Sequence, residues 1–328
     1  MKYYFAPLEG VTNHIYRNAY YKLFGSNGID KFYAPFVSPS ANPMLRGKEI
    51  ADIIPENNNP GINLIPQILA NRSDYFIKAA TQLIEMGYDK EINLNLGCPS
   101  GTVTSKDKGS GFLRHPDLMD SFFEEVFNWR DVSYPNLELS VKTRIGFYDA
   151  DEFPDILDVY NRYPISELTI HPRTKVQMYK DLPDITTFKY ACAHSTNPLV
   201  YNGNINSVKD YNMLLDGINA NVIMLGRGLI GNPNLVNELN GKEPITKQQL
   251  ADYLDSIMDA YRPYCPSDNN ILFKLKEFWT YVSVNFEDSH KAAKLIRKAQ
   301  TLEKYRQAAD TVFSTIELKN NISPKSPR

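Results

Sequence analysis

One cysteine, Cys98, stands in the segment NLGCPS, residues 95–100, where its surroundings favour an exposed position. It follows a short apolar run and precedes a run rich in Gly, Ser and Lys, residues 102–111, which we expect to form a mobile lid. A thiol with a pKa of roughly 8.5 is mostly protonated at neutral pH, so it suits a general acid better than a nucleophile. A buried structural thiol is the alternative interpretation, and it is the one we expect for Cys192 and Cys265.

Polar residues also end other apolar runs. Lys142 closes a run where an uncompensated ammonium would be costly, so we expect it to face an anionic or electron-rich ligand. A flavin fits, because a lysine beside its ring stabilises the negative charge that develops on N1 and O2 on reduction. The alternative for Lys142 is a side chain that reaches solvent or an aspartate partner. His171 beside Arg173 is a candidate ligand contact in the same way, with a core histidine as the alternative. The amide of Gln67 is another candidate, with a hydrogen bond to a neighbouring loop as the alternative.

Two glycine-containing segments could hold a phosphate. They read NGNI, residues 202–205, and GRGLIG, residues 226–231, and the second contains Arg227. Glycines allow the backbone to approach an anion closely, and the arginine adds a fixed charge. The second segment also has the spacing of a Rossmann dinucleotide site, but it follows the last strand-like run rather than the first, and Asn232-Pro233 interrupts the expected helix.

Eight short β-rich runs alternate with amphipathic segments over the first 240 residues or so, which predicts a (β/α)8 TIM barrel of α/β class. The runs are residues 3–8, 31–36, 62–68, 91–97, 137–143, 166–171, 198–203 and 221–226. Their apolar centres indicate strands buried on both faces. The expected helices include 73–87, 116–129, 152–163 and 206–216, opened by Ser73, Pro116, Asp151 and Asn206. In such a barrel, the polar strand ends named above meet at one face.

The strand pattern stops near residue 241, and helical patterns follow at 246–262, 270–284 and 289–319. We therefore predict a barrel domain over 1–243, an all-helical domain over 244–320 and a disordered tail over 321–328. Residues 1–244 hold 23 Lys and Arg against 28 Asp and Glu, whereas residues 245–328 hold 13 against 10. The helical domain carries a basic stripe, interpreted either as a solvated face or as a contact to a phosphate backbone: Lys291, Lys294, Arg297 and Lys298.

The composition excludes several other classes of protein. An apolar content of 42% and a charged content of 23% are ordinary for a globular enzyme. No run of 18 apolar residues and no signal-like start is present, so we expect a cytoplasmic protein without a membrane segment. Three cysteines without C-x-x-C spacing predict neither a disulfide framework nor a zinc or iron–sulfur site.

Taken in order, the motifs resemble those of bacterial tRNA-dihydrouridine synthases. They are APLEGVT (6–12), NLGCPS (95–100), VKTRIG (141–146), HPRT (171–174) with Gln177 and Tyr179, NG (202–203), and GRGLIGNP (226–233). The resemblance covers the whole barrel and extends into a helical domain of the expected size. It implies a bound FMN near Ala6, Pro7, Leu8, Gln67, Lys142, His171, Asn202, Gly203, Asn204, Gly226 and Arg227. It also implies that Asn95, Arg144, Arg173 and Tyr179 hold the target uridine.

The implied reaction reduces the C5=C6 bond of uridines in transfer RNA. NADPH or NADH reduces FMN, flavin N5 gives a hydride to C6, and Cys98 protonates C5. The base must first be unstacked into the pocket. We expect a monomer that needs no protein partner. Leu8, Pro172, Asn204 and Asn234 depart from the usual residues. The change at Asn204 and the spelling GCPSGTV of the Cys98 loop leave the subfamily open.

Three alternatives remain at this point. The first is a flavin-dependent dehydrogenase or reductase of free pyrimidines, of the dihydroorotate type, against which the basic helical domain argues. The second is reduction of uridine in a structured RNA other than transfer RNA. The third is a barrel that binds RNA without catalysis.

Overall fold

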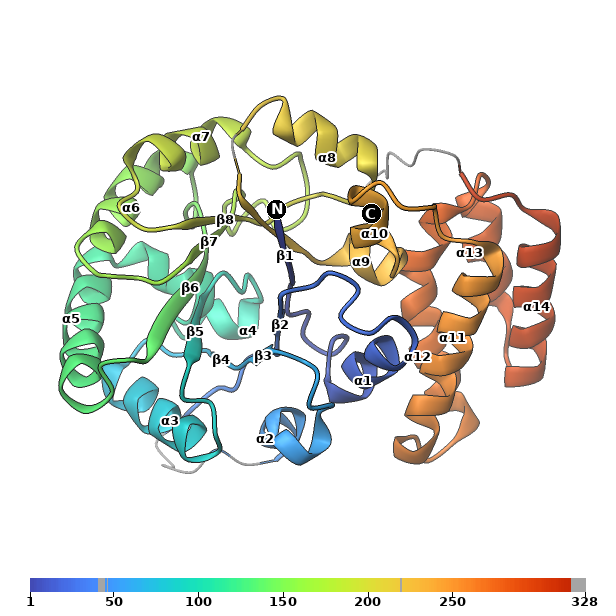
Figure 1. The fold of residues 1–328 in the computed structure, drawn as a ribbon, viewed down its shortest axis with the longest axis horizontal. Helices are drawn as coiled ribbons and strands as arrows, with labels where there is room; N and C mark the ends of the chain where they lie inside the picture. The colour runs from blue at the N-terminus through green and yellow to red at the C-terminus, as the bar shows by residue number, and fades with distance from the viewer. Residues whose placement is uncertain (41–44, 46, 219, 320–328) are drawn as a thin grey trace.

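The computed structural model describes residues 1–40, 45, 47–218 and 220–319. Within them, nine short strands form one sheet in which every pair is parallel, in the order β3-β2-β1-β9-β8-β7-β6-β5-β4 (Figure 1). The strands are β1 Lys2–Phe5, β2 Lys31–Tyr33, β3 Leu64–Ile65, β4 Gln67–Ile68, β5 Glu91–Leu96, β6 Glu138–Arg144, β7 Leu168–His171, β8 Leu199–Tyr201 and β9 Val222–Leu225.

The two edge strands β3 and β4 are halves of one predicted run, separated by Pro66. A proline nitrogen cannot donate to a ladder, so pairing breaks at this residue. β3 pairs with β2 and β4 pairs with β5, while the Pro66 carbonyl accepts from Asn93 N at 3.0 Å. The predicted run therefore joins both ends of the sheet, and the predicted TIM barrel is confirmed.

Helices surround the barrel. They are α1 His14–Phe24, α2 Lys48–Ile53, α3 Ser73–Glu85, α4 Gly101–Thr104, α5 Pro116–Ser133, α6 Phe153–Asn161, α7 Ile185–His194, α8 Val208–Leu215, α9 Arg227–Gly231 and α10 Leu235–Leu239. Pro116 opens α5 as predicted, because a missing N–H costs nothing in a first helical turn. The other three predicted capping residues lie one or two positions from the observed caps, although α3 does begin at Ser73 as expected. Ser73 is already helical, Asp149 caps the short turn before α6, and Ser207 caps α8 by accepting from Asp210 N.

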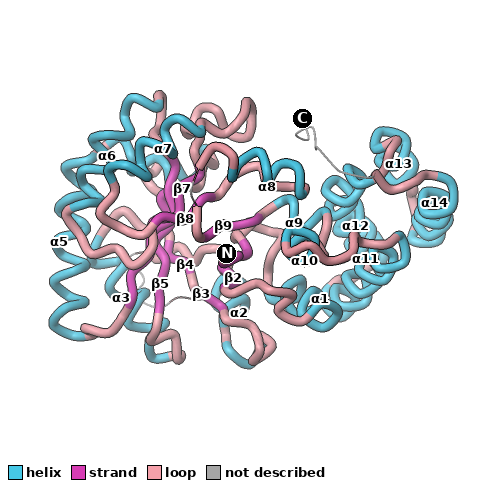
Figure 2. Tube along the Cα trace, turned by 45° about the horizontal axis from the view of Figure 1, so that its top comes forward, coloured by secondary structure: helices cyan, strands magenta, loops and turns pink. Residues whose placement is uncertain are grey.

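Four further helices lie together beside the barrel (Figures 1 and 2). They are α11 Lys247–Tyr261, α12 Asp268–Val282, α13 Ser289–Lys298 and α14 Leu302–Thr315. The predicted segment 289–319 is two helices, because Ala299 turns extended and Thr301 caps a new one. The group packs on α1, where Tyr16 stacks on Phe278 with ring centroids 5.3 Å apart. The predicted tail, 321–328, lies outside the described residues.

Two apolar clusters hold the barrel. One fills the space between strands and helices, and the smaller one fills the barrel itself: Tyr4, Ala6, Tyr33, Ile65, Val200 and Met224. Alternate residues of a strand point to opposite faces, so β1, β2, β3, β8 and β9 contribute to both clusters, whereas the inward residues of β4 to β7 are polar. No helix in the described part of the chain has the length and hydropathy to cross a membrane.

Candidate active site

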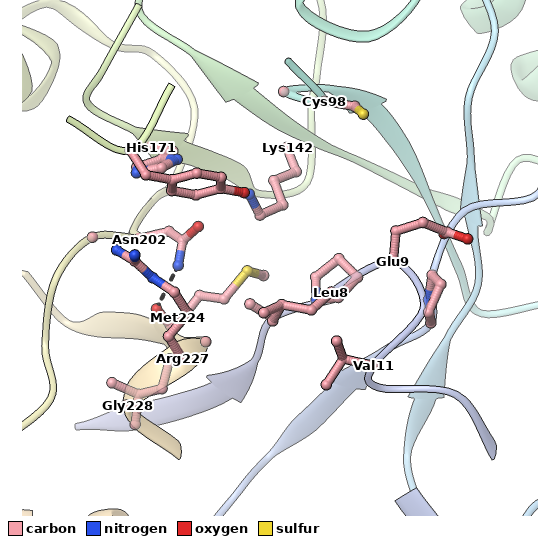
Figure 3. A pocket seen from close by; sticks show the side chains of 18 of the residues that line it. Leu8, Glu9, Val11, Cys98, Lys142, His171, Asn202, Met224, Arg227 and Gly228 are labelled. Carbon is pink, nitrogen blue, oxygen red and sulfur yellow. Dashed lines mark hydrogen bonds between the residues drawn. The ribbon is translucent and has the colours of Figure 1, made fainter. Parts of the chain in front are cut away.

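A cavity of about 450 Å³ opens at the carboxyl ends of the strands (Figure 3). Fifteen residues singled out from the sequence line it: Ala6, Pro7, Leu8, Gln67, Asn95, Cys98, Lys142, Arg144, His171, Tyr179, Asn202, Gly203, Asn204, Gly226 and Arg227. They come from the ends of most strands and from the loops that follow, as the barrel geometry predicts. In Figure 3, Lys142 lies between Cys98 on one side and His171 on the other.

Cys98 is held by its own loop. The Asn95 side-chain oxygen accepts hydrogen bonds from Gly97 N and Cys98 N, at 3.0 and 2.9 Å. The Ser110 hydroxyl and amide both donate to the Cys98 carbonyl. A Cβ on Gly109 would lie 2.8 Å from that carbonyl, so only glycine fits here. Burial raises the pKa of the Cys98 thiol, which keeps it protonated.

The predicted mobile lid, residues 102–111, is wrong in this structure. Part of the segment forms α4, and part forms a 3₁₀ turn over Gly109–Arg114 whose first five residues are buried. The glycines that suggested mobility instead allow close packing against the Cys98 loop. A Cβ on Gly111 would come within 2.9 Å of the Thr104 backbone.

A group of cations surrounds His171. Lys142, Arg144, Arg173 and Arg227 all act on its charge, and none of them forms an ion pair with a carboxylate in the described part of the chain. Burial, with Arg144 nearby, lowers the pKa of Lys142 to about 8. Burial and the same cations hold the pKa of His171 far below its ordinary value, so the imidazole is neutral. Uncompensated positive charge of this kind indicates a site for an anionic ligand.

Arg173 does not line the cavity. It is fully buried behind His171, and its Nη1 donates to His171 Nε2 at 2.8 Å. Its Nε donates to the Lys180 carbonyl and its Nη2 donates to the Asp181 carbonyl. Because a guanidinium can only donate, Nε2 is the acceptor and the imidazole proton sits on Nδ1. The structure thus places Arg173 behind His171 and not on the cavity wall, and its contact with substrate stays a prediction.

Arg144 ties two loops together at the cavity rim. It donates to the carbonyls of Gly97, Thr174 and Met178 at 3.0, 2.8 and 2.8 Å. The Tyr179 ring lies between two cations, 5.5 Å from the Arg144 guanidinium and 4.9 Å from that of Arg227. These contacts place a half-exposed aromatic ring over the cavity mouth.

The two glycine segments form one corner of the cavity. Asn202 donates to the Met224 carbonyl at 2.8 Å, and Arg227 donates to the Asn204 side chain at 3.0 Å. A Cβ on Gly228 would lie 2.3 Å from the Ile205 carbonyl, so the two backbones touch only because this residue is glycine. The segment follows β9, the last strand, which excludes the Rossmann interpretation.

The family is settled by comparison with known proteins. The profile described as dihydrouridine synthase matches residues 4–325. The chain belongs to the dihydrouridine synthase family. A probable tRNA-dihydrouridine synthase of Staphylococcus aureus strain Mu50 is 28% identical over 288 residues, 84% of this chain and 81% of that protein. The tRNA-dihydrouridine(16) synthase of Vibrio parahaemolyticus is 24% identical over 316 residues, 93% of each chain.

Solved structures agree on the fold of this dihydrouridine synthase. The old yellow enzyme homologue from Zymomonas mobilis superimposes with a TM-score of 0.52 at 14% identity, over 77% of this chain and 92% of that chain. Morphinone reductase in complex with tetrahydroNAD gives a TM-score of 0.50 at 11% identity, over 74% and 88%. At such low sequence identities, the similarity to these structures shows only that the barrel fold is shared.

Several cavity residues of this dihydrouridine synthase were missed from the sequence. Thr280 and Tyr281 reach the cavity from α12, in the helical region. Glu9 and Met224 line it from the barrel. The APLEGVT motif could have indicated Glu9, but no local pattern marks Tyr281, whose place depends on how α12 packs. The described residues contain no cluster of His, Cys, Asp or Glu suited to a metal ion.

The basic stripe of this dihydrouridine synthase lies outside the cavity. Lys291, Lys294, Arg297 and Lys298 are exposed on α13, while Ala292 and Ile296 of the same helix are buried. The helix is thus amphipathic, with one face packed and the other exposed.

Proposed function

We propose that the chain is a flavin-dependent tRNA-dihydrouridine synthase, an oxidoreductase that reduces the C5=C6 bond of uridines in tRNA. One observation carries the proposal. A half-buried, protonated thiol, Cys98, shares a single cavity with a group of cations that has no carboxylate partner among the described residues. The cations suit an anionic cofactor, and the thiol suits a proton donor to a substrate bound beside that cofactor.

The cavity residues fit FMN. Unpaired positive charge at Lys142, with the donors of Gln67 and His171, matches the electron-rich edge of an isoalloxazine ring. Arg227 and the glycine corner match its phosphate, and the small and apolar residues Ala6, Pro7 and Leu8 leave a surface for its flat ring. When bound, FMN supplies the hydride for C6 of uracil, and NADPH or NADH restores it.

The protein's own residues hold the base and move the proton. Cys98 gives its thiol proton to C5, and the resulting thiolate is reprotonated from solvent. Asn95, Arg144 and Tyr179 hold and orient the base at the rim, with Arg173 acting through His171. Because burial favours the neutral thiol, the acid is present over the whole neutral pH range.

Transfer RNA would lie across the cavity mouth and the helical region. A ring atom inside a stacked helix cannot reach Cys98, so the base must be extruded, which fits a target in a loop. We assign the helical segment 244–320 to RNA binding, with its α13 cations contacting phosphates. We expect the enzyme to act as a monomer in the cytoplasm.

The test uses purified protein loaded with FMN and NADPH. We expect it to convert uridine to dihydrouridine in an unmodified tRNA transcript, detected as a gain of two hydrogens by mass spectrometry. Dihydroorotate and free uracil should not turn over. Turnover of dihydroorotate with no change in tRNA would overturn the proposal, as would dihydrouridine formation confined to another structured RNA.

A further inference from the structure

A line of polar side chains runs through the barrel interior to the Cys98 loop. Glu91, Asn93 and Asn95 are alternate residues of β5, so all three point into the barrel, and all are buried. The neighbouring strands add Gln67 from β4 and Ser140 from β6, also buried. Glu91 is the first residue of β5, so it lies at the opposite end of the strand from Cys98.

Four hydrogen bonds join these five side chains. The Ser140 hydroxyl donates to Glu91 Oε1 at 2.6 Å, and Asn93 Nδ2 donates to that hydroxyl at 2.8 Å. Gln67 Nε2 donates to Asn93 Oδ1 at 2.7 Å, and Asn95 Nδ2 donates to Gln67 Oε1 at 2.7 Å. Every donor in the line faces the Glu91 end.

Both ends fix this direction independently. At the cavity end, Asn95 Oδ1 accepts from Gly97 N and Cys98 N, and backbone N–H groups can only donate. At the far end, the Glu91 carboxylate can only accept, and Lys31 Nζ holds its other oxygen at 2.6 Å. Both ends require the same hydrogen-bond direction along all five side chains. If any amide in the line rotated by half a turn, one of its N–H groups would face another N–H group.

We propose that Glu91 is a positioning residue for Cys98, because it sets the polarity of the hydrogen-bonded line that holds the Cys98 loop. The proposal rests on the proposed function only in assigning Cys98 as the acid. The direction of the line also determines which hydrogen-bonding group Asn95 presents to a ligand in the cavity. Asn95 Oδ1 is fully used by two backbone donors, so Asn95 presents only an N–H, and the ligand atom opposite it must be an acceptor such as a ring carbonyl.

A reversal of polarity tests the line. In Glu91→Gln, the Lys31 ammonium retains the amide oxygen, so the new NH₂ group faces Ser140 and opposes the original direction. The mismatch then falls at Ser140, whose hydroxyl can accept from both NH₂ groups only by leaving its own proton without an acceptor, and this weakens the line at its Glu91 end. Adding Asn93→Asp removes it, because a carboxylate at 93 accepts from both Ser140 and Gln67. The double variant keeps the net charge of the wild type and satisfies every link of the line. The Tyr33 hydroxyl, which donates to Glu91 Oε1 at 3.1 Å, meets the same NH₂ group in both variants, so it does not distinguish them.

The measurement is amide hydrogen exchange at Gly97 and Cys98, which requires neither RNA nor flavin turnover. We expect Glu91→Gln to speed this exchange about tenfold, the scale of one lost hydrogen bond. We expect the double variant to return most of the way to wild type, with α5 amides unchanged in all proteins. Unchanged exchange in Glu91→Gln, or a double variant no better than Glu91→Gln, would overturn the proposal.

A second pair of variants guards against poor folding of Glu91→Gln. Ser140→Ala cuts the line without changing charge, and it should also speed exchange at Cys98. Ser166→Ala is the matched control, because the Ser166 hydroxyl is buried with no hydrogen-bond partner in the described structure. Equal exchange in these two variants would overturn the proposal. Since the readout is structural, its failure would leave the proposed reaction untouched, and failure of the reaction would leave this result standing.

Discussion

Lys142→Met should stabilise the flavin-free protein at neutral pH. Burial lowers the pKa of Lys142 from an ordinary 10.5 to about 8, so the folded state holds this proton less tightly than the unfolded state. At 1.36 kcal/mol per pKa unit, the charge destabilises the folded protein by about 3 kcal/mol below pH 8. Methionine removes the charge with little change in shape. The unfolding free energy at pH 7 should therefore increase by about 3 kcal/mol, with flavin affinity reduced.

The stability difference between Lys142→Met and wild type should depend on pH. The penalty is present in full below pH 8 and is lost as the pH rises toward 10.5, where the unfolded lysine also loses its proton. Urea unfolding should show that the difference in unfolding free energy between wild type and Lys142→Met is present at pH 7 and disappears near pH 10.5. Lys209→Met, at an exposed lysine of α8, should leave the unfolding free energy unchanged at both pH values. A Lys142→Met protein no more stable than wild type at pH 7 would refute the reasoning.

Three further predictions concern the thiol, the histidine and the basic stripe. In a Cys192→Ser, Cys265→Ser background, the rate of Cys98 alkylation should keep rising with pH above roughly pH 8.5, the pKa of an ordinary thiol. The reason is that burial raises the pKa of the Cys98 thiol, and a rate that levels off below that pH would contradict the prediction. Nitrogen NMR should show His171 neutral with its proton on Nδ1 at pH 6, and Arg173→Ala should allow both tautomers; a protonated ring in the wild type would oppose the assignment. Changing the α13 lysines to glutamine should weaken the salt dependence of tRNA binding. The slope of the logarithm of the binding constant against the logarithm of the salt concentration should fall by about one for each phosphate that α13 no longer neutralises, and an unchanged slope would show that α13 does not contact RNA. These lysines are Lys291, Lys294 and Lys298.

The barrel and most of the cavity were predictable because one rule sufficed. Side chains at the carboxyl ends of parallel barrel strands meet at one face, so locating the strand ends located Gln67, Lys142 and His171. The rule does not describe what lies behind those ends. Arg173 follows His171 by two residues, but the loop that carries Lys180 and Asp181 folds over it and buries it.

The hydrogen-bond partners of the polar residues of β5 could not be predicted from the sequence. The apolar centre of EINLNL predicts a strand buried on both faces, although its polar and apolar residues alternate. All six are buried, with Glu91, Asn93 and Asn95 inside the barrel. Whether such polar residues find partners depends on which strands stand beside them, here β4 and β6, and that follows from closure of the barrel. Tyr281 was missed for a similar reason, since α12 reaches the cavity only through its packing.

The most direct test of the central claim is to map dihydrouridine by mass spectrometry in tRNA from three strains. One carries the wild-type gene, one lacks it, and one carries Cys98→Ala at the native level. We predict that at least one tRNA position holds dihydrouridine in the first strain and uridine in the other two, while purified Cys98→Ala protein keeps its flavin. Identical dihydrouridine maps in all three strains would contradict the account.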